Sequence, residues 1–149
     1  MIHILTGEKG DGKTKRILDM ANEAVKTSHG NIIFIDSDNQ NMYGLHYNIR
    51  FIETSDFPIS NYRELIGFIC GIISQDNDIE KIYIDSVNQI LKNLDNYDLI
   101  KFVRKLSYLS QKYSSEFFLS LSTSEESIPY ELRDLVMNWW NCIINIQII

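Results

Sequence analysis

The stretch Gly7–Thr14, with the sequence GEKGDGKT, limits the possible folds of this chain more than any other feature. It follows directly on a short apolar run, Ile2–Thr6, and leads into an amphipathic pattern that extends from Lys13 to about Lys26. A strand, a glycine-rich turn and a helix in this order begin a β–α unit. In such a turn, glycines let backbone N–H groups converge at the positive end of the helix, where they bind phosphate. The expected phosphate-binding residues are Gly7, Glu8, Lys9, Gly10, Asp11, Gly12, Lys13 and Thr14.

Two side chains of this loop carry specific chemistry. Lys13 places a positive charge against the outer phosphates of a nucleotide, so it is both a binding residue and a catalytic candidate. The hydroxyl of Thr14 is a hard oxygen ligand of the kind that Mg²⁺ prefers. Glu8, Lys9 and Asp11 are variable positions of this pattern and have no fixed role. The sequence therefore predicts a site for a nucleotide and Mg²⁺.

The rest of the chain alternates between strand and helix patterns. Short apolar runs rich in Ile, Phe or Tyr predict further buried strands at Asn31–Asp36, Lys81–Asp85, Phe117–Leu121 and Cys142–Ile149. Amphipathic stripes predict helices around residues 65–73 and 99–113, and a short helix from near residue 129 to about residue 137. Gly67 and Gly71 lie four apart in the second helix, where a neighbour could approach closely. Tyr47–Thr54 alternates and could form an extra edge strand.

This alternation predicts βαβ units with right-handed crossovers. We expect one domain of 149 residues, an α/β three-layer sandwich with a five-stranded, mainly parallel sheet. Fourteen basic and 20 acidic residues give a net charge of −6, which makes nucleic acid an unlikely partner. No apolar run approaches the roughly 20 residues that span a membrane. The two cysteines, Cys70 and Cys142, lie in apolar runs and are expected to be buried thiols of a cytoplasmic protein.

Acidic residues end two of the predicted strands. Asp85 closes the run IYID, where a carboxylate could hold Mg²⁺ together with Thr14. Asp36 and Asp38 follow the run IIFI and are candidates to position the attacking water. The alternative explanation for Asp85 is a helix N-cap or turn aspartate after a strand, and for Asp36 and Asp38 it is a solvated polar turn.

The loop sequence matches the Walker A pattern G-x-x-x-x-G-K-[ST], and Ile82–Ser86 resembles a Walker B motif. On these residues the chain resembles the P-loop NTPases of the RecA-like, additional-strand branch. The resemblance implies ATP and Mg²⁺ as cofactors. It also implies the strand order 5-1-4-3-2, with strands counted from Ile2–Thr6 to Cys142–Ile149 and with Phe117–Leu121 between Ile2–Thr6 and Lys81–Asp85.

Looser likenesses add further expectations. The stretch 36–41 resembles the acidic segment after the second strand of ParA-like ATPases, where the first aspartate helps to activate water. Lys9 invites comparison with the extra lysine of the ParA/MinD ATPases, although the spacing to Lys13 is one residue shorter here. In RecA-like proteins, a polar residue at the end of the strand next to the P-loop strand senses the γ-phosphate. This predicts sensor roles for Ser120, Ser122 and Thr123.

The sequence supports three functions. The first is a weak ATPase or nucleotide-dependent switch that acts through a protein partner or self-assembly, similar to small orphan bacterial ATP-binding proteins. Ser86 stands where many enzymes of this branch carry a catalytic glutamate, so hydrolysis in isolation is expected to be slow. The second is a small-molecule or nucleotide kinase, and the third is a nucleotide-binding module without hydrolysis.

Overall fold

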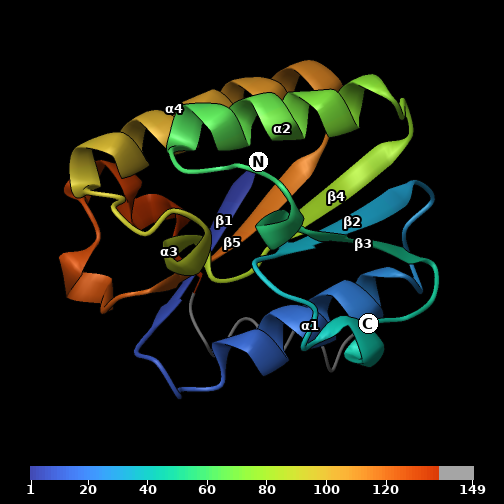
Figure 1. Cartoon of the computed structure of the whole chain (residues 1–149), viewed down its shortest axis with the longest axis horizontal. Coiled ribbons are helices and arrows are strands. Elements are labelled where there is room, and N and C mark those ends of the chain that lie inside the picture. Colours follow the sequence, from blue (N-terminus) through green and yellow to red (C-terminus); the bar gives the residue numbers. More distant parts are fainter. Residues whose placement is uncertain (138–149) are drawn as a thin grey trace.

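The computed structural model describes residues 1–137, in which a single parallel sheet forms the centre of the molecule (Figure 1). The strand order is β1-β5-β4-β2-β3, and every neighbouring pair is parallel. The strands are β1 (Ile2–Gly7), β2 (Asn31–Asp36), β3 (Ile49–Glu53), β4 (Ile79–Ile84) and β5 (Glu116–Ser122). The α/β class and the parallel sheet predicted from the sequence are thus confirmed.

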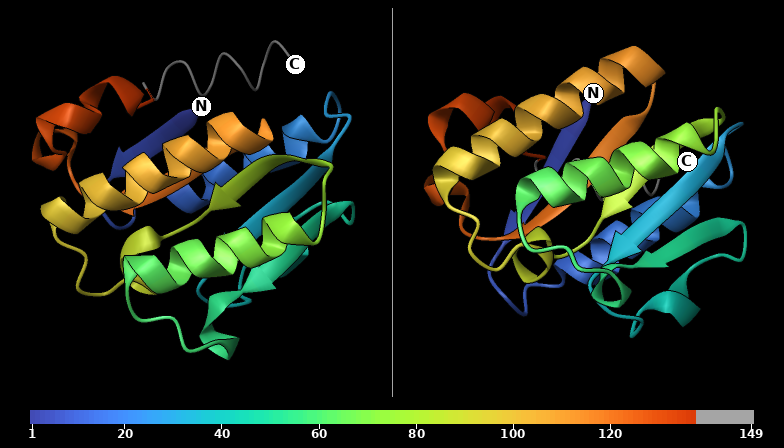
Figure 2. Two further views of the ribbon diagram at one scale, coloured as in Figure 1. Left: turned by 90° about the horizontal axis from the view of Figure 1, so that it is seen from above. Right: turned by 45° about the horizontal axis from the view of Figure 1, so that its top comes forward.

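Helices cover both faces of this sheet. One face carries α2 (Tyr62–Ser74) and α4 (Asn96–Tyr113), which lie side by side, and the other carries α1 (Lys13–Ala24) (Figures 1 and 2). Short helices connect the main elements: α3 (Val87–Ile90) and the 3₁₀ turns η1 (Met42–Gly44), η2 (Thr54–Asp56), η3 (Glu125–Ser127) and η4 (Tyr130–Leu135). The helix expected from residue 129 to 137 is therefore the 3₁₀ turn η4.

The strand order both agrees with and departs from the expected one. β5 lies between β1 and β4, as predicted. In this arrangement Leu5 lies opposite Ser120, and Ile82 lies opposite Phe117. The sheet as a whole does not have the order 5-1-4-3-2. The edge of the sheet beside β2 is formed by β3, which confirms the predicted extra edge strand at Tyr47–Thr54. The segment Cys142–Ile149, expected to be the last strand, lies outside the described residues.

A row of aromatic rings crosses the sheet on the face that α1 covers. One ring from each strand lies at matched register, and neighbouring rings are 4.5 to 6.4 Å apart between centroids. The row consists of His3, Phe118, Tyr83, Phe34 and Phe51. The small side chains of Ala21 and Ala24 let α1 pack close to this face. The ring row and the helix thus form one of the two layers packed on the sheet.

Two sequence expectations about α2, on the burial of Cys70 and on a close neighbour at its glycines, are wrong. Cys70 is exposed on α2, because the buried stripe of that helix runs through Leu65, Ile69 and Ile73 instead. Gly67 and Gly71 have no neighbour within 4 Å of where a Cβ would lie, so no element approaches them closely. Cys142 lies outside the described residues. Between residues 1 and 137, no helix is long and apolar enough to cross a membrane.

The turn that leads into β2 requires glycine at position 30. A Cβ on Gly30 would lie 2.4 Å from the carbonyl oxygen of Asp78 and 2.9 Å from Cβ of Glu80. The same Asp78 oxygen accepts the N–H of Asn31 at 2.7 Å, so it is held in place where β2 begins beside β4. The backbone must therefore shift to accept any side chain at this position.

We expect Gly30→Ala to lower the free energy of unfolding by about 1–3 kcal/mol, the usual cost of forcing atoms into a packed site. Urea denaturation of the purified variants measures it. Gly67→Ala is the matched control, because the same change in an open helical position stabilises by up to about 1 kcal/mol. Equal effects of the two substitutions would contradict the close approach at Gly30.

Candidate functional site

The glycine-rich loop lies between β1 and α1, at the edge of the sheet where the strands end (Figure 1). Gly10 has φ 94° and Gly12 has φ 85°, both in the left-handed region that side chains disfavour. Gly12 is also the N-cap of α1, and no side chain caps the helix there. The backbone of the loop therefore leads into an uncapped helix N-terminus, where N–H groups and the helix dipole favour an anion.

Lys13 lies within this loop. The residue is buried, and its ammonium group donates a hydrogen bond of 2.8 Å to the carbonyl oxygen of Glu8. The carboxylate of Asp11 accepts the N–H of Glu8 at 2.7 Å, which closes the turn. Lys9 is exposed. The loop thus holds the positive charge of Lys13 against its own backbone.

Asp85 connects the loop to the centre of the sheet. Its carboxylate accepts the hydroxyl of Thr14 at 3.0 Å on one oxygen and the hydroxyl of Ser120 at 2.5 Å on the other. Asp85 is buried, and the two hydroxyl groups come from α1 and β5. Burial with both oxygens hydrogen-bonded fixes this carboxylate in one orientation.

The residue after Asp85 contributes to this arrangement through its backbone. Ser86 has φ 55°, in the left-handed region, and its N–H donates a hydrogen bond of 2.6 Å to the hydroxyl of Ser120. Ser120 is fully buried, and its hydroxyl both accepts the hydrogen bond from Ser86 and donates one to Asp85. Sequence reasoning placed Ser120 at this strand end as a sensor, but it could not show that the hydroxyl acts on Asp85.

The residues around Asp85 fit Mg²⁺. Thr14 and Asp85 supply a hydroxyl and a carboxylate within hydrogen-bonding distance of each other, and both are hard oxygen ligands. Mg²⁺ is usually bound by one or two protein oxygens together with substrate phosphates and water. Between residues 1 and 137, no group of three or more His, Cys, Asp or Glu side chains could hold a metal by itself. A magnesium ion here would therefore need further oxygen ligands, such as water or phosphate.

Asp36 ends β2, next to Asp85 across the sheet. The N–H of Asp85 donates 2.9 Å to the carbonyl oxygen of Ile35, which holds the two strand ends together. The carboxylate of Asp36 accepts the N–H of Ser37 at 2.7 Å and the side-chain amide of Asn41 at 3.3 Å. Burial, and then the negative charge of Asp85, raise the pKa of Asp36 to about 6. A carboxylate with this pKa can take up a proton near neutral pH.

The raised pKa of Asp36 gives a sign for the pH dependence of stability. In the unfolded chain this group ionises near its ordinary pKa of 3.8, and in the folded chain only near 6. Between these values the folded state binds more protons, so this residue's contribution to stability falls as pH rises from about 4 to about 6.

We expect Asp36→Asn to remove this loss, so that the variant gains stability relative to the wild type as pH rises through that range. Urea denaturation at pH 4 and pH 7 measures the difference. Asp56→Asn, at an exposed position of η2, is the control and should show no such trend. A constant difference between Asp36→Asn and the wild type at both pH values would contradict the raised pKa.

The remaining predicted residues lie along the same edge. Asp38 accepts the N–H of Gln40 at 3.0 Å. The N–H of Ser122 donates to the side chain of Asn88 at 2.8 Å, and the carbonyl oxygen of Thr123 accepts the N–H of Gly7 at 2.9 Å. The structure thus brings every predicted strand-end residue to one edge of the sheet.

Sequence reasoning missed two asparagines, Asn41 and Asn88. Asn41 holds the carboxylate of Asp36. Asn88 fixes the end of β5 through Ser122. Asn41 lies in a turn five residues after Asp36, and Asn88 lies in the short helix α3, three residues after Asp85. No pattern of spacing distinguishes either from an ordinary polar residue after a strand.

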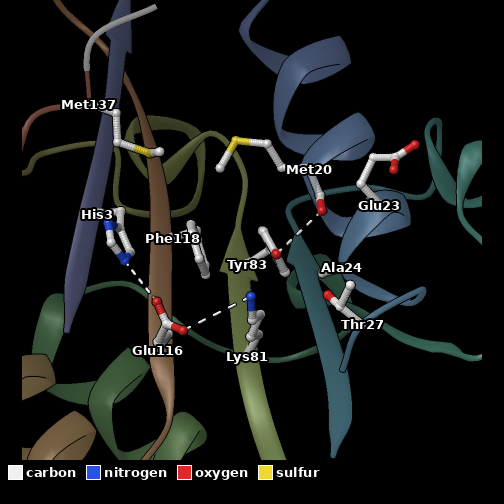
Figure 3. A pocket seen from close by; sticks show the side chains of 10 residues that line it. All are labelled: His3, Met20, Glu23, Ala24, Thr27, Lys81, Tyr83, Glu116, Phe118 and Met137. Carbon is white, nitrogen blue, oxygen red and sulfur yellow. Dashed lines mark hydrogen bonds and ion pairs between the residues drawn. The ribbon is translucent and has the colours of Figure 1, made fainter. Parts of the chain in front are cut away.

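Two hollows flank these elements. A cleft of about 710 Å³ opens beside Ser37 and Asp38 at the carboxyl ends of the strands. A smaller cavity of about 190 Å³ lies over His3 and Phe118, where Glu116 pairs with His3 at 2.9 Å and approaches Lys81 at 4.0 Å (Figure 3). None of the predicted site residues lines the smaller cavity. In parallel sheets, ligands bind at the carboxyl ends of the strands, so the first hollow is the functional candidate.

No known protein family matches this sequence, and no curated protein is similar enough to match it. The candidate site therefore stands on its own geometry.

Proposed function

We propose that this chain binds ATP with Mg²⁺ in the loop Gly7–Thr14 and hydrolyses it slowly in isolation. In this proposal the fold is that of a P-loop NTPase of the RecA-like branch. The observation that carries the proposal is the hydrogen bond of 3.0 Å between the hydroxyl of Thr14 and the carboxylate of Asp85, which are 71 residues apart in the chain. A chance glycine-rich turn would have no reason to meet a buried acid at the end of a second strand.

Each part of the site has a role in this proposal. The backbone N–H groups of the loop and the helix N-terminus bind the phosphates, and Lys13 neutralises the outer ones. Thr14 and Asp85 hold Mg²⁺, directly or through water. Asp36, or Asp38 beside it, orients the water that attacks the γ-phosphate. Ser120 acts through Asp85, which it holds in place.

The slow rate follows from the residue after Asp85. Ser86 has no carboxylate with which to activate water, so that task is left to the end of β2. An arginine supplied by a partner is worth about 10³–10⁵ in rate in related phosphoryl transfers. In this proposal the protein is a switch. Its nucleotide is hydrolysed when a partner protein, or a second copy of the chain, supplies the missing catalytic group.

Two measurements test the proposal. Isothermal titration with ATP should show binding that strengthens when Mg²⁺ is added, and phosphate release by the isolated protein should stay below about 1 s⁻¹, at the low end of typical turnover numbers. Absence of ATP binding would overturn the proposed function. Faster turnover would show that a catalytic group other than those named here is in place. Binding without any turnover would favour the module that does not hydrolyse.

A kinase is the second candidate. The observation that favours it is the cleft of about 710 Å³, which lies beside the proposed catalytic carboxylates and is far larger than a water molecule needs.

A further inference from the structure

The cleft at the carboxyl edge of the sheet has walls from three separate segments. Ser37 and Asp38 come from the end of β2, Ser55 and Phe57 from η2 and the residue after it, and Asn88 and Gln89 from α3. A hydrogen bond of 3.2 Å between the hydroxyl of Ser37 and the side chain of Gln89 joins the first and third of these segments. The cleft is therefore a built feature of the fold, supported by the same strand ends as Asp36 and Asp85.

Its lining combines an aromatic ring with many hydrogen-bonding groups. The ring of Phe57 is about half exposed and packs on Phe68 of α2, with centroids 5.1 Å apart, which holds it in position. The polar lining offers hydroxyl groups, two side-chain amides, the carboxylate of Asp38 and the ammonium group of Lys92. These groups can both donate and accept hydrogen bonds. A ring surface together with such groups suits a molecule that has one flat, weakly polar face and several hydroxyls.

The position of the cleft connects it to the proposed nucleotide site. Ser37 directly follows Asp36 at the end of β2, the backbone N–H of Asp85 donates a hydrogen bond of 2.9 Å to the carbonyl oxygen of Ile35 in the same strand, and the carboxylate of Asp85 accepts the hydroxyl of Thr14 in α1. A molecule in the cleft therefore lies beside the place where the outer phosphate and Mg²⁺ are proposed to bind.

We propose that this cleft binds the second substrate of a phosphoryl transfer, a small polyhydroxylated molecule of the sugar, polyol or nucleoside class. This inference rests on the proposed function, because the phosphate comes from the bound ATP. It also agrees with slow hydrolysis in isolation, since the site would then be built for a hydroxyl group in place of water.

The reaction balances without any further reactant. A bond forms between a hydroxyl oxygen of the acceptor and the γ-phosphorus, and the bond from that phosphorus to the β,γ-bridging oxygen breaks. ADP leaves with the electron pair of that bond. The proton of the hydroxyl goes to the carboxylate of Asp38, which lines the cleft. The products are ADP and a phosphate monoester.

The first experiment measures acceptor binding directly, without nucleotide. Saturation-transfer NMR and isothermal titration use glycerol, ribose, glucose and the common ribonucleosides and deoxyribonucleosides, each at millimolar concentration. At least one of these compounds should bind, and Phe57→Ala should weaken its binding about tenfold. Tyr130→Ala removes an equally large exposed ring outside the cleft and should leave the binding unchanged.

The second experiment follows the γ-phosphate of labelled ATP in the presence of the same compounds. The compound that binds should be converted to its phosphate ester at least ten times faster than phosphate is released to water. Asp38→Asn should slow this transfer at saturating acceptor concentration, because asparagine can still hydrogen-bond the acceptor but cannot take its proton. Asp56→Asn, an exposed neighbour, is the matched control and should leave the transfer unchanged.

The outcomes separate the two proposals. Failure of ATP to bind would overturn the proposed function, and the first experiment would still decide whether the cleft holds a hydroxylated molecule. Binding of ATP with no binding of any compound would overturn the acceptor cleft and leave the switch in place. Binding of a compound without transfer, or binding that Phe57→Ala does not alter, would also contradict the cleft as an acceptor site.

Discussion

Replacing Lys13 with alanine is expected to weaken ATP binding by roughly 100-fold, the value of a charged hydrogen bond to phosphate in a partly desolvated site. The ammonium group of this residue points into its own loop and donates 2.8 Å to the carbonyl oxygen of Glu8. When phosphates enter the loop, this is the positive charge that can meet them at contact distance. Without it the backbone N–H groups and the helix dipole remain, so a weak affinity should persist.

The fold should survive this substitution. Alanine is the best helix former at the first position of α1, and the change leaves only one loop carbonyl without its partner. Lys15→Ala is the control, because Lys15 lies on the same helix with an exposed side chain that pairs with Asp19. Isothermal titration with ATP measures both variants. Equal ATP affinities of Lys13→Ala and the wild type would contradict the proposal that the loop Gly7–Thr14 binds the phosphates of ATP.

Replacing Asp85 with asparagine is expected to remove most of the increase in ATP affinity that Mg²⁺ causes, by at least about tenfold. Asparagine keeps the shape of the side chain and one accepting oxygen, so the contacts to Thr14 and Ser120 can be rearranged through rotation of their hydroxyls. The negative charge that attracts the cation is lost. Titration with ATP in the presence of Mg²⁺ and of EDTA isolates the metal-dependent part.

A second substitution at this position separates charge from packing. Asp85→Ala leaves both hydroxyls without their acceptor and should lower the free energy of unfolding by about 1–3 kcal/mol, because the hydroxyl of Ser120 is fully buried. Asp56→Asn is the control for removal of a carboxylate on the surface. If Asp85→Asn kept the full response to Mg²⁺, Asp85 would hold Thr14 as a structural partner and nothing more.

The loop and the strand-end acids could be predicted because their signals are local. A glycine-rich turn between an apolar run and an amphipathic stripe specifies its own structure, and the end of a parallel strand specifies where its last side chain lies. The meeting of Thr14 with Asp85 follows from these two facts once the sheet is parallel. The place of β5 could also be predicted. Buried hydroxyls at the end of a strand are tolerated only when a partner binds them, which favoured a central position beside β1.

Other parts depended on contacts that no local pattern encodes. The exposure of Cys70 is decided by which stripe of α2 packs on the sheet, and an almost wholly apolar helix offers several stripes. The cleft could not be predicted from the sequence, because two of the elements that form it, η2 and α3, are too short to show a helical period. The pairing of Ser120 with Asp85 needed the register of β5 against β4, which is a property of the whole sheet.

The left-handed backbone of Ser86 implies that the end of β4 carries conformational strain. A residue with a side chain costs roughly 1–2 kcal/mol more than glycine in this conformation, and serine keeps it here because the hydrogen bond to Ser120 and the burial of Asp85 hold the backbone. Glycine at position 86 would relieve the strain, but it would also let the peptide after Asp85 rotate. Thermal stability and the fixed orientation of the Asp85 carboxylate therefore oppose each other at this residue, because a glycine there would relieve strain but hold the carboxylate less firmly.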